Sequence, residues 1–459
     1  MSLMVSISGI RGIIGSSLTP EVIVRYVGAY AEYCRKRSPS LPTVVLGRDG
    51  RVTGNMVAHI AASTLIARGV DVRAIGICPT PTVQLAVEKT GAAGGIAVTA
   101  SHNPMEWNGL KFMASTGMFL DAEENREFWS LADHPGTYAP WNALGSHTAD
   151  DSWLRKHIDA VLALPCIDKN SLRKRKFRVV LDCVNAAGGL IVPDLLKELG
   201  CDVIGMNCDV SGIFSHKPEP LPENLTELAA RVRSEHADLG IAVDPDVDRL
   251  VLITESGEPY SEEYTVASAV KFVLAKHRPK PGERVSVAVN LSTTRAVDDI
   301  AGEFGAHVVR TPVGEINVAK RMKQIGALVG GEGSGGVILP AVHLGRDAIV
   351  GIGLILQMLA ESGKTLSGLK STLPQYSIAK GTVELGRRSP DDILAALRPG
   401  LPGTVNTEDG LKVDLPDSWV HFRKSNTEPI IRIIAEARTQ SEARTAVDSY
   451  RKKILGLAH

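Results

Sequence analysis

Three stretches of the chain repeat one pattern: a β-branched apolar run, a helical segment, a glycine and a second apolar run. They begin at Thr43 to Asp49, at Arg178 to Asn185 and at Arg284 to Asn290. In each stretch a glycine ends the expected helix and the chain then enters another strand. This succession is a β-α-β unit, which requires a mostly parallel sheet covered on its faces. The pattern therefore predicts three related α/β domains in tandem.

The C-terminal part of the chain does not repeat this unit. It predicts an α+β domain with strands at Trp419 to Arg423 and Ile430 to Ala435 and a helix at Gln440 to Leu455. Two segments have the composition of linkers, since His134 to Asp150 is rich in Pro, Gly, Thr and Ser, and Ser371 to Ser377 contains a proline. A length of 459 residues is compatible with three or four domains.

The composition narrows the possible partners and the location. Lys plus Arg and Asp plus Glu both number 51, and a net charge of zero disfavours nucleic acid and anionic membranes as partners. We find no signal peptide, and the longest apolar stretch, Ala348 to Ala360, is too short to span a bilayer. The six cysteines form no CxxC pair. These features favour a reduced cytoplasmic protein.

Each predicted unit is followed by an apolar strand that runs into an unusual loop. These loops are Ala100 to Pro104, Asp244 to Arg249 and Gly330 to Gly336. Because ligands of open α/β sheets collect at the carboxyl ends of strands, we expect the three loops to line one shared cleft.

Asp244, Asp246 and Asp248 are the most specific signal. If the segment is extended, alternate side chains point the same way, and three carboxylates on one side repel one another unless a cation lies between them. Clustered hard oxygen ligands suit Mg²⁺ or Ca²⁺. Arg249 adds a ligand of the kind that binds phosphate. The alternative is a solvated acidic turn.

Ser101 directly follows a strand, and Pro104 keeps its loop out of helical geometry. A serine beside a divalent-metal loop fits phosphoryl transfer, in which the metal neutralises phosphate oxygens and the serine oxygen carries the group. The alternatives are a serine that caps a turn and a hydrolase that uses Ser101 and His102. The hydrolase is disfavoured because the chain has no GxSxG elbow.

Two further loops have the composition of ligand sites. Glu332 and Ser334 alternate with glycines and offer an acceptor and a hydroxyl to a polyol, although a flexible turn has the same composition. The bend between the two C-terminal strands combines cations, hydroxyls, an amide and turn N–H groups, which suits a phosphate dianion better than a solvated hairpin. Its candidate residues are Arg423, Ser425, Asn426 and Thr427, with Arg432 on the next strand.

Some residues are not distinguished by local pattern. Arg11, Arg48 and Arg51 are of a type that most often lies on the surface or in ion pairs. The Pro-rich segment that begins at His216 is typical of a linker.

Together the loops resemble those of the α-D-phosphohexomutase family, which includes phosphoglucomutases and phosphomannomutases. Four motifs occur in the family's order, and three weaker ones extend the resemblance over essentially the whole chain. The strong motifs are TASHNP at Thr99 to Pro104, DPDVDR at Asp244 to Arg249, GEGSGG at Gly331 to Gly336 and RKSNTEP at Arg423 to Pro429. The weaker ones are SGIRG at Ser8 to Gly12, GRDGRVTG at Gly47 to Gly54 and PEPLPENL at Pro218 to Leu225.

The resemblance implies three α/β domains and a smaller α+β C-terminal domain around a central cleft. Its expected boundaries are 1–150, 151–256, 257–372 and 373–459. The enzyme would be an intramolecular phosphotransferase that interconverts hexose 6-phosphate and hexose 1-phosphate, with Mg²⁺ and a hexose 1,6-bisphosphate as cofactors. The partner would be a small sugar phosphate, with neither nucleic acid nor membrane, and the protein a monomer or homodimer.

The resemblance also implies residue roles. Ser101 would be the phosphoserine, and Asp244, Asp246 and Asp248 would hold Mg²⁺ together with an oxygen of its phosphate. Glu332 and Ser334 would bind sugar hydroxyls. The non-reacting phosphate would be bound by Arg423, Ser425, Asn426, Thr427 and Arg432. Arg11, His102, Lys111 and Arg249 would surround the transferring group, with Lys111 or His102 as general acid or base.

The chain departs from the commonest family pattern at Pro245, at Ile7 to Gly9 and at two glycines of the sugar loop, Gly333 and Gly336. With GRDAI at Gly345 to Ile349, this variant resembles the archaeal-type phosphoglucosamine mutases. A broad phosphoglucomutase/phosphomannomutase is the alternative. Two other classes also remain: a phosphatase with Asp244 as nucleophile, and a non-catalytic protein that binds sugar phosphates.

Overall fold

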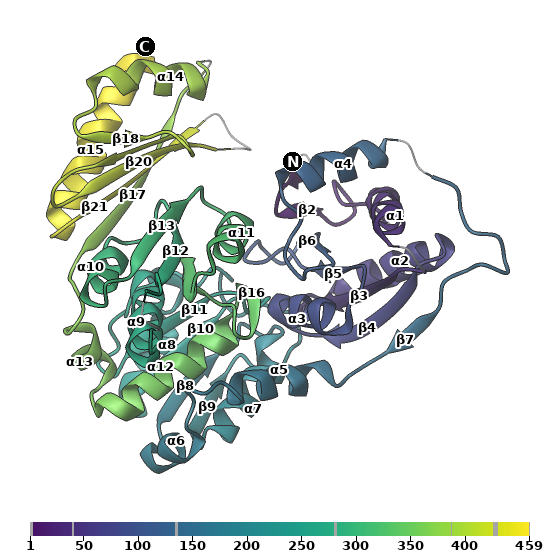
Figure 1. Ribbon diagram of the computed structural model, residues 1–459, viewed down its shortest axis with the longest axis horizontal. Helices are drawn as coiled ribbons and strands as arrows, with labels where there is room; N and C mark the ends of the chain where they lie inside the picture. The colour runs from purple at the N-terminus through teal and green to yellow at the C-terminus, as the bar shows by residue number, and fades with distance from the viewer. Residues whose placement is uncertain are drawn as a thin grey trace.

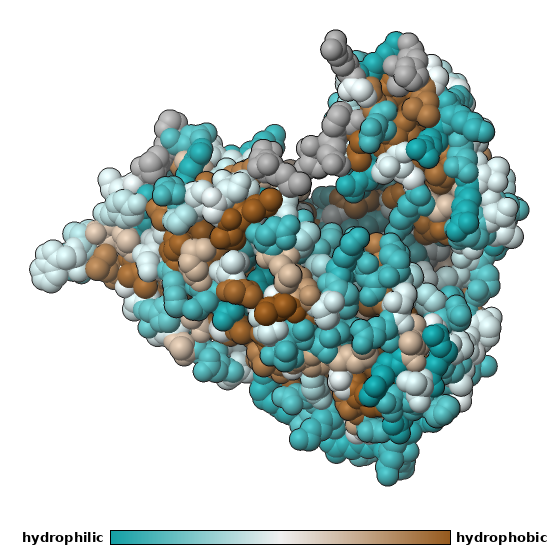
Figure 2. Space-filling view, turned by 180° about the vertical axis from the view of Figure 1, so that it is seen from behind, coloured by the Kyte–Doolittle hydropathy of each residue, from teal (hydrophilic) through white to brown (hydrophobic). Residues whose placement is uncertain are grey.

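The computed structural model describes residues 3–38, 41–133, 136–279, 282–386, 388–425 and 430–458. Within these residues the strands form four sheets of seven, four, five and five strands, which follow one another along the chain. Figure 1 shows the N-terminal unit on the right, two units in the centre and the C-terminal unit at the upper left. Seen from behind, the surface is hollowed between the N-terminal and C-terminal units (Figure 2).

The first three sheets share a four-stranded unit, as the repeated pattern predicted. In each unit the first strand lies between the second and third, parallel to both, and a fourth strand adds antiparallel to the third. In spatial order the strands are β4 (Asp71–Ile77), β3 (Thr43–Arg48), β5 (Gly94–Val98) and β6 (Trp107–Ala114); β9 (Asp202–Met206), β8 (Arg178–Asp182), β10 (Leu239–Val243) and β11 (Leu250–Thr254); and β13 (His307–Thr311), β12 (Ser286–Asn290), β14 (Val329–Glu332) and β15 (Gly336–Leu339).

Additional strands extend two of these sheets. They are β1 (Met4–Ser6) and β2 (Gly9–Ile13) beyond β6, β7 (His147–Ala149) beyond β4, and β16 (His343–Arg346) beyond β15. The interpretation of 134–150 as only a linker was wrong, because β7 pairs in parallel with β4. Its approach is fixed by Ser146, whose N–H and hydroxyl both donate to Asp71. The segment therefore covers an otherwise open sheet edge.

Helices connect and cover the sheets. They are α1 (Pro20–Arg37), α2 (Gly54–Ala67), α3 (Thr80–Thr90), α4 (Ala122–Ala132), α5 (Trp153–Leu162), α6 (Lys169–Arg175), α7 (Gly188–Glu198), α8 (Thr226–Ser234), α9 (Glu262–Lys276), α10 (Ala296–Glu303), α11 (Glu315–Ile325), α12 (Ala348–Ser362) and α13 (Leu366–Lys370). Helix α12 contains the longest apolar stretch and is buried on nearly all sides, as expected of a helix without a polar face. Among the described residues, no helix has both the length and the apolar character needed to cross a membrane.

The C-terminal unit is the predicted α+β domain, with an antiparallel sheet and two helices. In spatial order its strands are β17 (Ser377–Glu384), β21 (Ile430–Ala437), β20 (Trp419–Lys424), β19 (Leu411–Asp414) and β18 (Thr404–Asn406), and its helices are α14 (Pro390–Leu397) and α15 (Gln440–Ala458). Phe422 and Ile433 belong to an apolar cluster confined to this unit.

Besides clusters of their own, the first three units share one buried apolar cluster. Val45, Val179 and Val287, one from each sheet, belong to the same buried apolar cluster. The C-terminal unit is connected to that body by the segment predicted as a linker. There the hydroxyl of Tyr264 on α9 donates to the carbonyl of Pro374 and accepts from the N–H of Tyr376, each at 2.9 Å.

A buried polar cluster also connects the first three units. Nε2 of His157 on α5 and Nε2 of His343 on β16 each donate to Oδ2 of Asp347, at 2.7 and 3.0 Å. Oδ1 of Asp347 caps α12, and Thr82 of α3 contacts Nδ1 of His157 at 2.9 Å. Helices from three units thus meet at one carboxylate.

Candidate active site

The acidic loop follows β10 at the carboxyl end of the second sheet. Asp244, Asp246 and Asp248 are completely buried, and each offers a carboxylate oxygen within 4.8 Å of the other two. The expectation of an extended segment was wrong, because the chain turns here: Oδ1 of Asp244 accepts the N–H groups of Asp248 and Arg249, both at 3.2 Å. Val247 has φ of 59°, a strained value for a β-branched residue. The turn, rather than strand alternation, brings the carboxylates together.

A positively charged side chain contacts this cluster, but two of the carboxylate oxygens are left without a hydrogen-bond partner among the described residues. Nζ of Lys111 on β6 lies 2.6 Å from Asp246 Oδ2 and 3.3 Å from Asp248 Oδ2. The second oxygens of both aspartates are buried and have no hydrogen-bond partner within the described chain. Since a buried polar atom normally has such a partner, and carboxylate oxygens are the ligands that Mg²⁺ prefers, the donor set fits a divalent cation.

The pKa shifts follow from this crowding. Burial raises the pKa of Asp244, and the charges of Asp248 and Asp246 raise it further. Burial also acts to raise the pKa of Asp246, but the Lys111 ammonium more than reverses the effect and holds it below its usual range. Burial acts to lower the pKa of Lys111, but the charges of Asp246 and Asp248 outweigh this and raise it, so this lysine stays charged.

Ser101 comes from the first sheet's loop and reaches the acidic loop of the second. Its side chain is buried, and its Oγ lies 3.3 Å from Asp244 Oδ2 and 3.3 Å from His102 Nδ1. Its φ of 50° falls in the left-handed region, which is uncommon for a residue other than glycine. The fold therefore brings the predicted serine to the acidic loop, although Ser101 and Asp244 lie 143 positions apart in sequence.

Arg51 fixes this strained loop, and it lies in an ion pair, one of the two environments expected for it. The side chain is buried. Its terminal nitrogens donate to four backbone carbonyls in and beside the loop, those of Ser101, Asn103, Pro104 and Trp107. Nε pairs with Asp49 at 3.1 Å, so the guanidinium is fully used inside the protein.

Arg11, His102 and Arg249 border the same serine. Nε of Arg11 is buried and has no hydrogen-bond partner among the residues described, as expected of a group that binds an anion. Nε of Arg249 also has no hydrogen-bond partner there, but it lies 3.8 Å from Asp248 Oδ1. Burial, followed by the charges of Arg249 and Arg11, lowers the pKa of His102. Glu219 lies 3.8 Å from His102 and 3.7 Å from Arg249, so the Pro-rich segment that was interpreted as a linker borders the site.

The glycine-rich loop of the third sheet presents Glu332 in a defined orientation. Its Oε1 accepts from Asn290 Nδ2 and from the Gly314 N–H, both at 2.8 Å, and its Oε2 accepts from Arg346 at 2.9 Å. Ser334 lies 3.4 Å from the same Arg346 nitrogen. The two predicted sugar ligands therefore lie on one side of the loop.

Two glycines of this loop leave room for charged side chains. A Cβ on Gly333 would lie 2.1 Å from the carboxylate of Glu263, and a Cβ on Gly336 would lie 2.2 Å from the side chain of Arg346. Burial raises the pKa of Glu263 to about 8. The departures from the commonest family pattern thus have a steric reason.

Arg346 is a residue of the candidate site that local sequence patterns do not indicate. It lies on β16 and donates to Asp248 at 2.7 Å, to Glu332 at 2.9 Å and to Glu315 at 3.1 Å. It therefore joins the acidic loop to the sugar loop. The segment Gly345 to Ile349 carries a signal only through the family resemblance, and no local pattern distinguishes this arginine from a surface one.

The C-terminal loop has the features of an anion site. Arg423 on β20 and Arg432 on β21 are directly opposite each other in the sheet, and Arg423 also pairs with Asp409 at 2.8 Å. A bound anion between the two arginines would relieve their remaining repulsion. Ser425 N–H donates to the Ile430 carbonyl at 3.0 Å and closes the bend. Asn426 and Thr427, which were predicted to bind phosphate here, lie outside the described residues.

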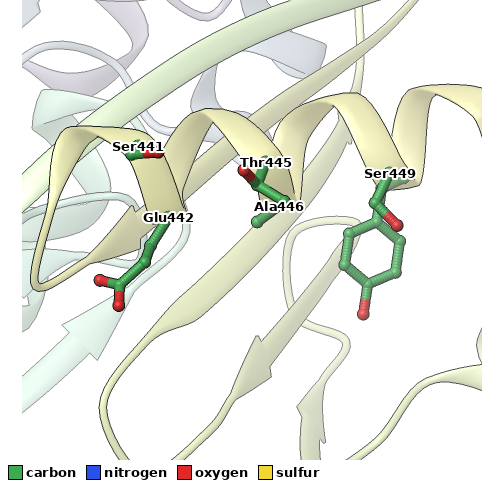
Figure 3. Close-up of a pocket in the computed structure, with 6 residues that line it drawn as sticks. Ser441, Glu442, Thr445, Ala446 and Ser449 are labelled. Atoms are coloured by element: carbon green, nitrogen blue, oxygen red, sulfur yellow. The ribbon is translucent and has the colours of Figure 1, made fainter.

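Two cavities lie elsewhere. A polar one of about 650 Å³ is bordered by the start of α9, the linker and the first residues of β17. The other, of about 440 Å³, is lined by residues of the single helix α15, five of which are labelled in Figure 3. Neither is lined by the predicted catalytic or metal-binding residues, so neither competes with the loop cluster as the active site.

Four family models match the chain in order. They are described as phosphoglucomutase/phosphomannomutase alpha/beta/alpha domain I over residues 4–137, domain II over 155–257 and domain III over 261–376, and the C-terminal domain over 383–453.

Individual relatives match along nearly their whole length. A protein of Methanopyrus kandleri named "probable phosphoglucosamine mutase" is 36% identical over 447 residues, 96% of each chain. A "phosphoglucomutase/phosphomannomutase" of Thermococcus kodakarensis is 37% identical over 443 residues, 95% of each chain. The crystal structure of a phosphoglucomutase/phosphomannomutase family protein from Burkholderia thailandensis has a TM-score of 0.84 at 26% identity, and the match covers 99% of this chain and 98% of that one.

Proposed function

Because the chain belongs to the phosphoglucomutase/phosphomannomutase family, we propose that it is a phosphohexomutase that interconverts glucosamine 6-phosphate and glucosamine 1-phosphate. The observation that carries the mechanism is the position of the Ser101 hydroxyl, 3.3 Å from a carboxylate oxygen of the buried acidic loop. The relative from M. kandleri supports the amino sugar. The relative from T. kodakarensis makes a broad phosphoglucomutase/phosphomannomutase the alternative.

The acidic loop would hold Mg²⁺. Asp244, Asp246 and Asp248 supply the oxygens, and an oxygen on phosphorylated Ser101 would add a further ligand. When bound, the metal supplies positive charge that stabilises the oxygens of the transferring phosphoryl group.

The protein's own groups would transfer the phosphoryl group in two steps. The group leaves the oxygen of Ser101 for the free hydroxyl of the sugar phosphate, which gives a hexose 1,6-bisphosphate. The sugar then turns in the cleft, and its other phosphoryl group passes to Ser101, so that the enzyme regains its starting form. Arg11 and Arg249 would stabilise the charge of the moving group.

The proton transfers have two candidates. His102, whose pKa is lowered, is neutral near pH 7, the form that can accept a proton. Lys111, whose pKa is raised, is charged near pH 7, the form that can donate one. In either orientation of the sugar, Glu332 and Ser334 would bind ring hydroxyls while Arg423 and Arg432 bind the phosphate that does not react.

Phosphorus NMR tests this proposal directly. The protein, with Mg²⁺ and a trace of hexose 1,6-bisphosphate, receives glucosamine 1-phosphate, and glucose, mannose and N-acetylglucosamine 1-phosphates in parallel. A 6-phosphate signal that grows fastest with glucosamine 1-phosphate is expected. We expect Ser101→Ala to remove nearly all turnover and EDTA to stop the wild type until Mg²⁺ is restored.

Other outcomes lead to different conclusions. Release of inorganic phosphate would indicate a phosphatase with an aspartate nucleophile. Equal rates with glucose and mannose phosphates would favour the broad enzyme. Wild-type turnover by Ser101→Ala would exclude the phosphoserine mechanism. The cytoplasmic location, the oligomeric state and the domain boundaries stay predictions.

A further inference from the structure

The carboxylate of Glu332 is oriented by two neighbouring segments of the third unit. Asn290 lies at the end of β12, and its side chain donates to Glu332 Oε1 at 2.8 Å. Gly314 directly precedes α11, and its N–H donates to the same oxygen at 2.8 Å. A shift of either segment would therefore weaken the contacts of Oε1, whereas Oε2 is held by Arg346 at 2.9 Å.

The C-terminal unit docks on these same two segments. Asp409 Oδ2, in the turn between β18 and β19, accepts from the N–H of Val313 at 2.9 Å. His421 on β20 contacts the hydroxyl of Ser292 at 2.8 Å through Nδ1, and the carbonyl of Asp409 at 2.6 Å through Nε2. The N–H of Ser292 in turn donates to the side chain of Asn290 at 2.9 Å.

One oxygen of Asp409 also reaches the phosphate loop. Besides the Val313 N–H, Oδ2 accepts from Nε of Arg423 at 2.8 Å. This bond leaves the two terminal nitrogens of Arg423 available to a phosphate, which a guanidinium can bind through two parallel hydrogen bonds. A single atom therefore lies between the predicted phosphate-binding arginine and the segment that orients Glu332.

The turn that carries Asp409 is held tightly against its own sheet. Gly410 has φ of 74°, and a Cβ there would lie 2.1 Å from the carbonyl oxygen of Phe422 on β20. Asp409 therefore moves with the C-terminal sheet, although its side chain is about a fifth exposed. An ordinary surface ion pair would not also bond a backbone N–H of another unit.

We propose that Asp409 is a positioning residue. It fixes the position of the phosphate-binding arginine, Arg423, relative to the sugar-binding carboxylate of Glu332. This inference rests on the proposed function, in which Arg423 and Glu332 bind one substrate. Docking of the C-terminal unit then orients Glu332 through Val313 and Gly314. Because both contacts depend on this docking, loss of the Asp409 bonds would weaken the phosphate and sugar contacts together.

The test compares Asp409→Ala and Asp409→Asn with Asp417→Asn, a control at an exposed aspartate of the same unit that pairs with Arg438. For Asp409→Ala we expect KM for the hexose phosphate to rise roughly tenfold, with kcat changed less than about threefold, because ground-state positioning is lost. Asp409→Asn keeps an acceptor and should recover part of the loss. An unchanged KM in a folded Asp409→Ala protein would overturn the proposal.

A double-mutant cycle separates positioning from a general loss of structure. If Asp409 acts through Glu332, adding Asp409→Ala to Glu332→Gln should lower kcat/KM by less than about twofold further, because interacting sites are not additive. Independent, multiplying losses would overturn the proposal even if each variant is impaired alone.

A wild-type protein without mutase turnover would contradict the proposed function, and the positioning role is then tested by hydrogen exchange. Asp409→Ala should speed exchange of the Val313 and Gly314 N–H groups relative to the Asp417→Asn control. Equal exchange in the two variants would exclude the coupling.

Discussion

At the scale of single residues, the buried Arg51 and the largely buried Arg346 determine the geometry of the cleft. Burial lowers the pKa of Arg346, but Asp248, Glu332 and Glu315 more than reverse this and hold its pKa well above the usual value. Arg51 instead satisfies backbone carbonyls around the strained serine. Both side chains exploit the planar fork of five N–H donors, which a lysine does not have.

The substitution Arg51→Lys tests this role. Lysine keeps the charge but has one nitrogen in place of a fork, so buried acceptors lose their partners. We expect the free energy of unfolding to fall by about 3 kcal/mol, in the range for a broken buried pair, and kcat to fall more than about tenfold because Ser101 is displaced. Urea denaturation and the mutase assay measure these effects. Arg25→Lys, at an exposed arginine, is the control and should behave as wild type; a fully active, fully stable Arg51→Lys would contradict the assignment.

At the scale of elements, the candidate catalytic and ligand-binding residues lie on loops at the carboxyl ends of strands. Helices that meet at buried polar groups fix the positions of these loops relative to one another. The Asp347 cluster is the clearest example, since α3, α5 and α12 converge on it. Burial acts to raise the pKa of Asp347, but His157 and His343 more than reverse this and lower it below the usual range.

This shift predicts how stability depends on pH. An aspartate whose pKa is depressed by folding stabilises the protein above the unfolded pKa of about 3.9, and the stabilisation is lost as the pH falls towards the folded pKa. Below about pH 4, wild type should therefore lose stability more steeply than Asp347→Asn, by up to about 1.4 kcal/mol per pH unit. Asparagine keeps the helix cap. Urea denaturation between pH 5 and 3 measures the two slopes, and parallel slopes would exclude this contribution.

At the scale of the whole molecule, three units share a core and the fourth has its own. The candidate ligand groups are divided between these bodies: the serine, acidic and sugar loops belong to the first, and the phosphate loop belongs to the second. A ligand that contacts all four loops should therefore hold the C-terminal unit in a fixed position relative to the first three units.

Ligand-linked stability tests this arrangement. With Mg²⁺ present, hexose 1,6-bisphosphate at 100 times its Kd should raise the free energy of unfolding by about 2.7 kcal/mol. Thermal unfolding measures the shift. A neutral hexose should have no effect, and Arg423→Ala should show a smaller shift at the same ligand concentration. An equal shift in Arg423→Ala would mean that the C-terminal unit does not bind the ligand.

Much of the fold and part of the site were predictable from local sequence. The strands, the glycines that end helices and the α+β tail were predicted because periodicity and helix stops act over a few residues. Strand β7 was missed because it forms only by pairing with the edge of β4. The contact between Ser146 and Asp71 that positions it joins residues 75 positions apart in sequence. The convergence of the aspartates was correctly predicted, but its cause was a turn that strand alternation does not describe.

The sequence by itself determined the repeated β-α-β unit and the loops in which a serine, three aspartates and a glycine-rich segment follow strands. Only the tertiary structure decided the partners of the arginines and of Asp409. Arg346 meets Asp248 across 98 positions, and Asp409 meets Val313 across 96. Neither end of such a pair carries a local signal, because a hydrogen bond between distant residues forms only when packing of separate sheets brings their loops within about 3 Å.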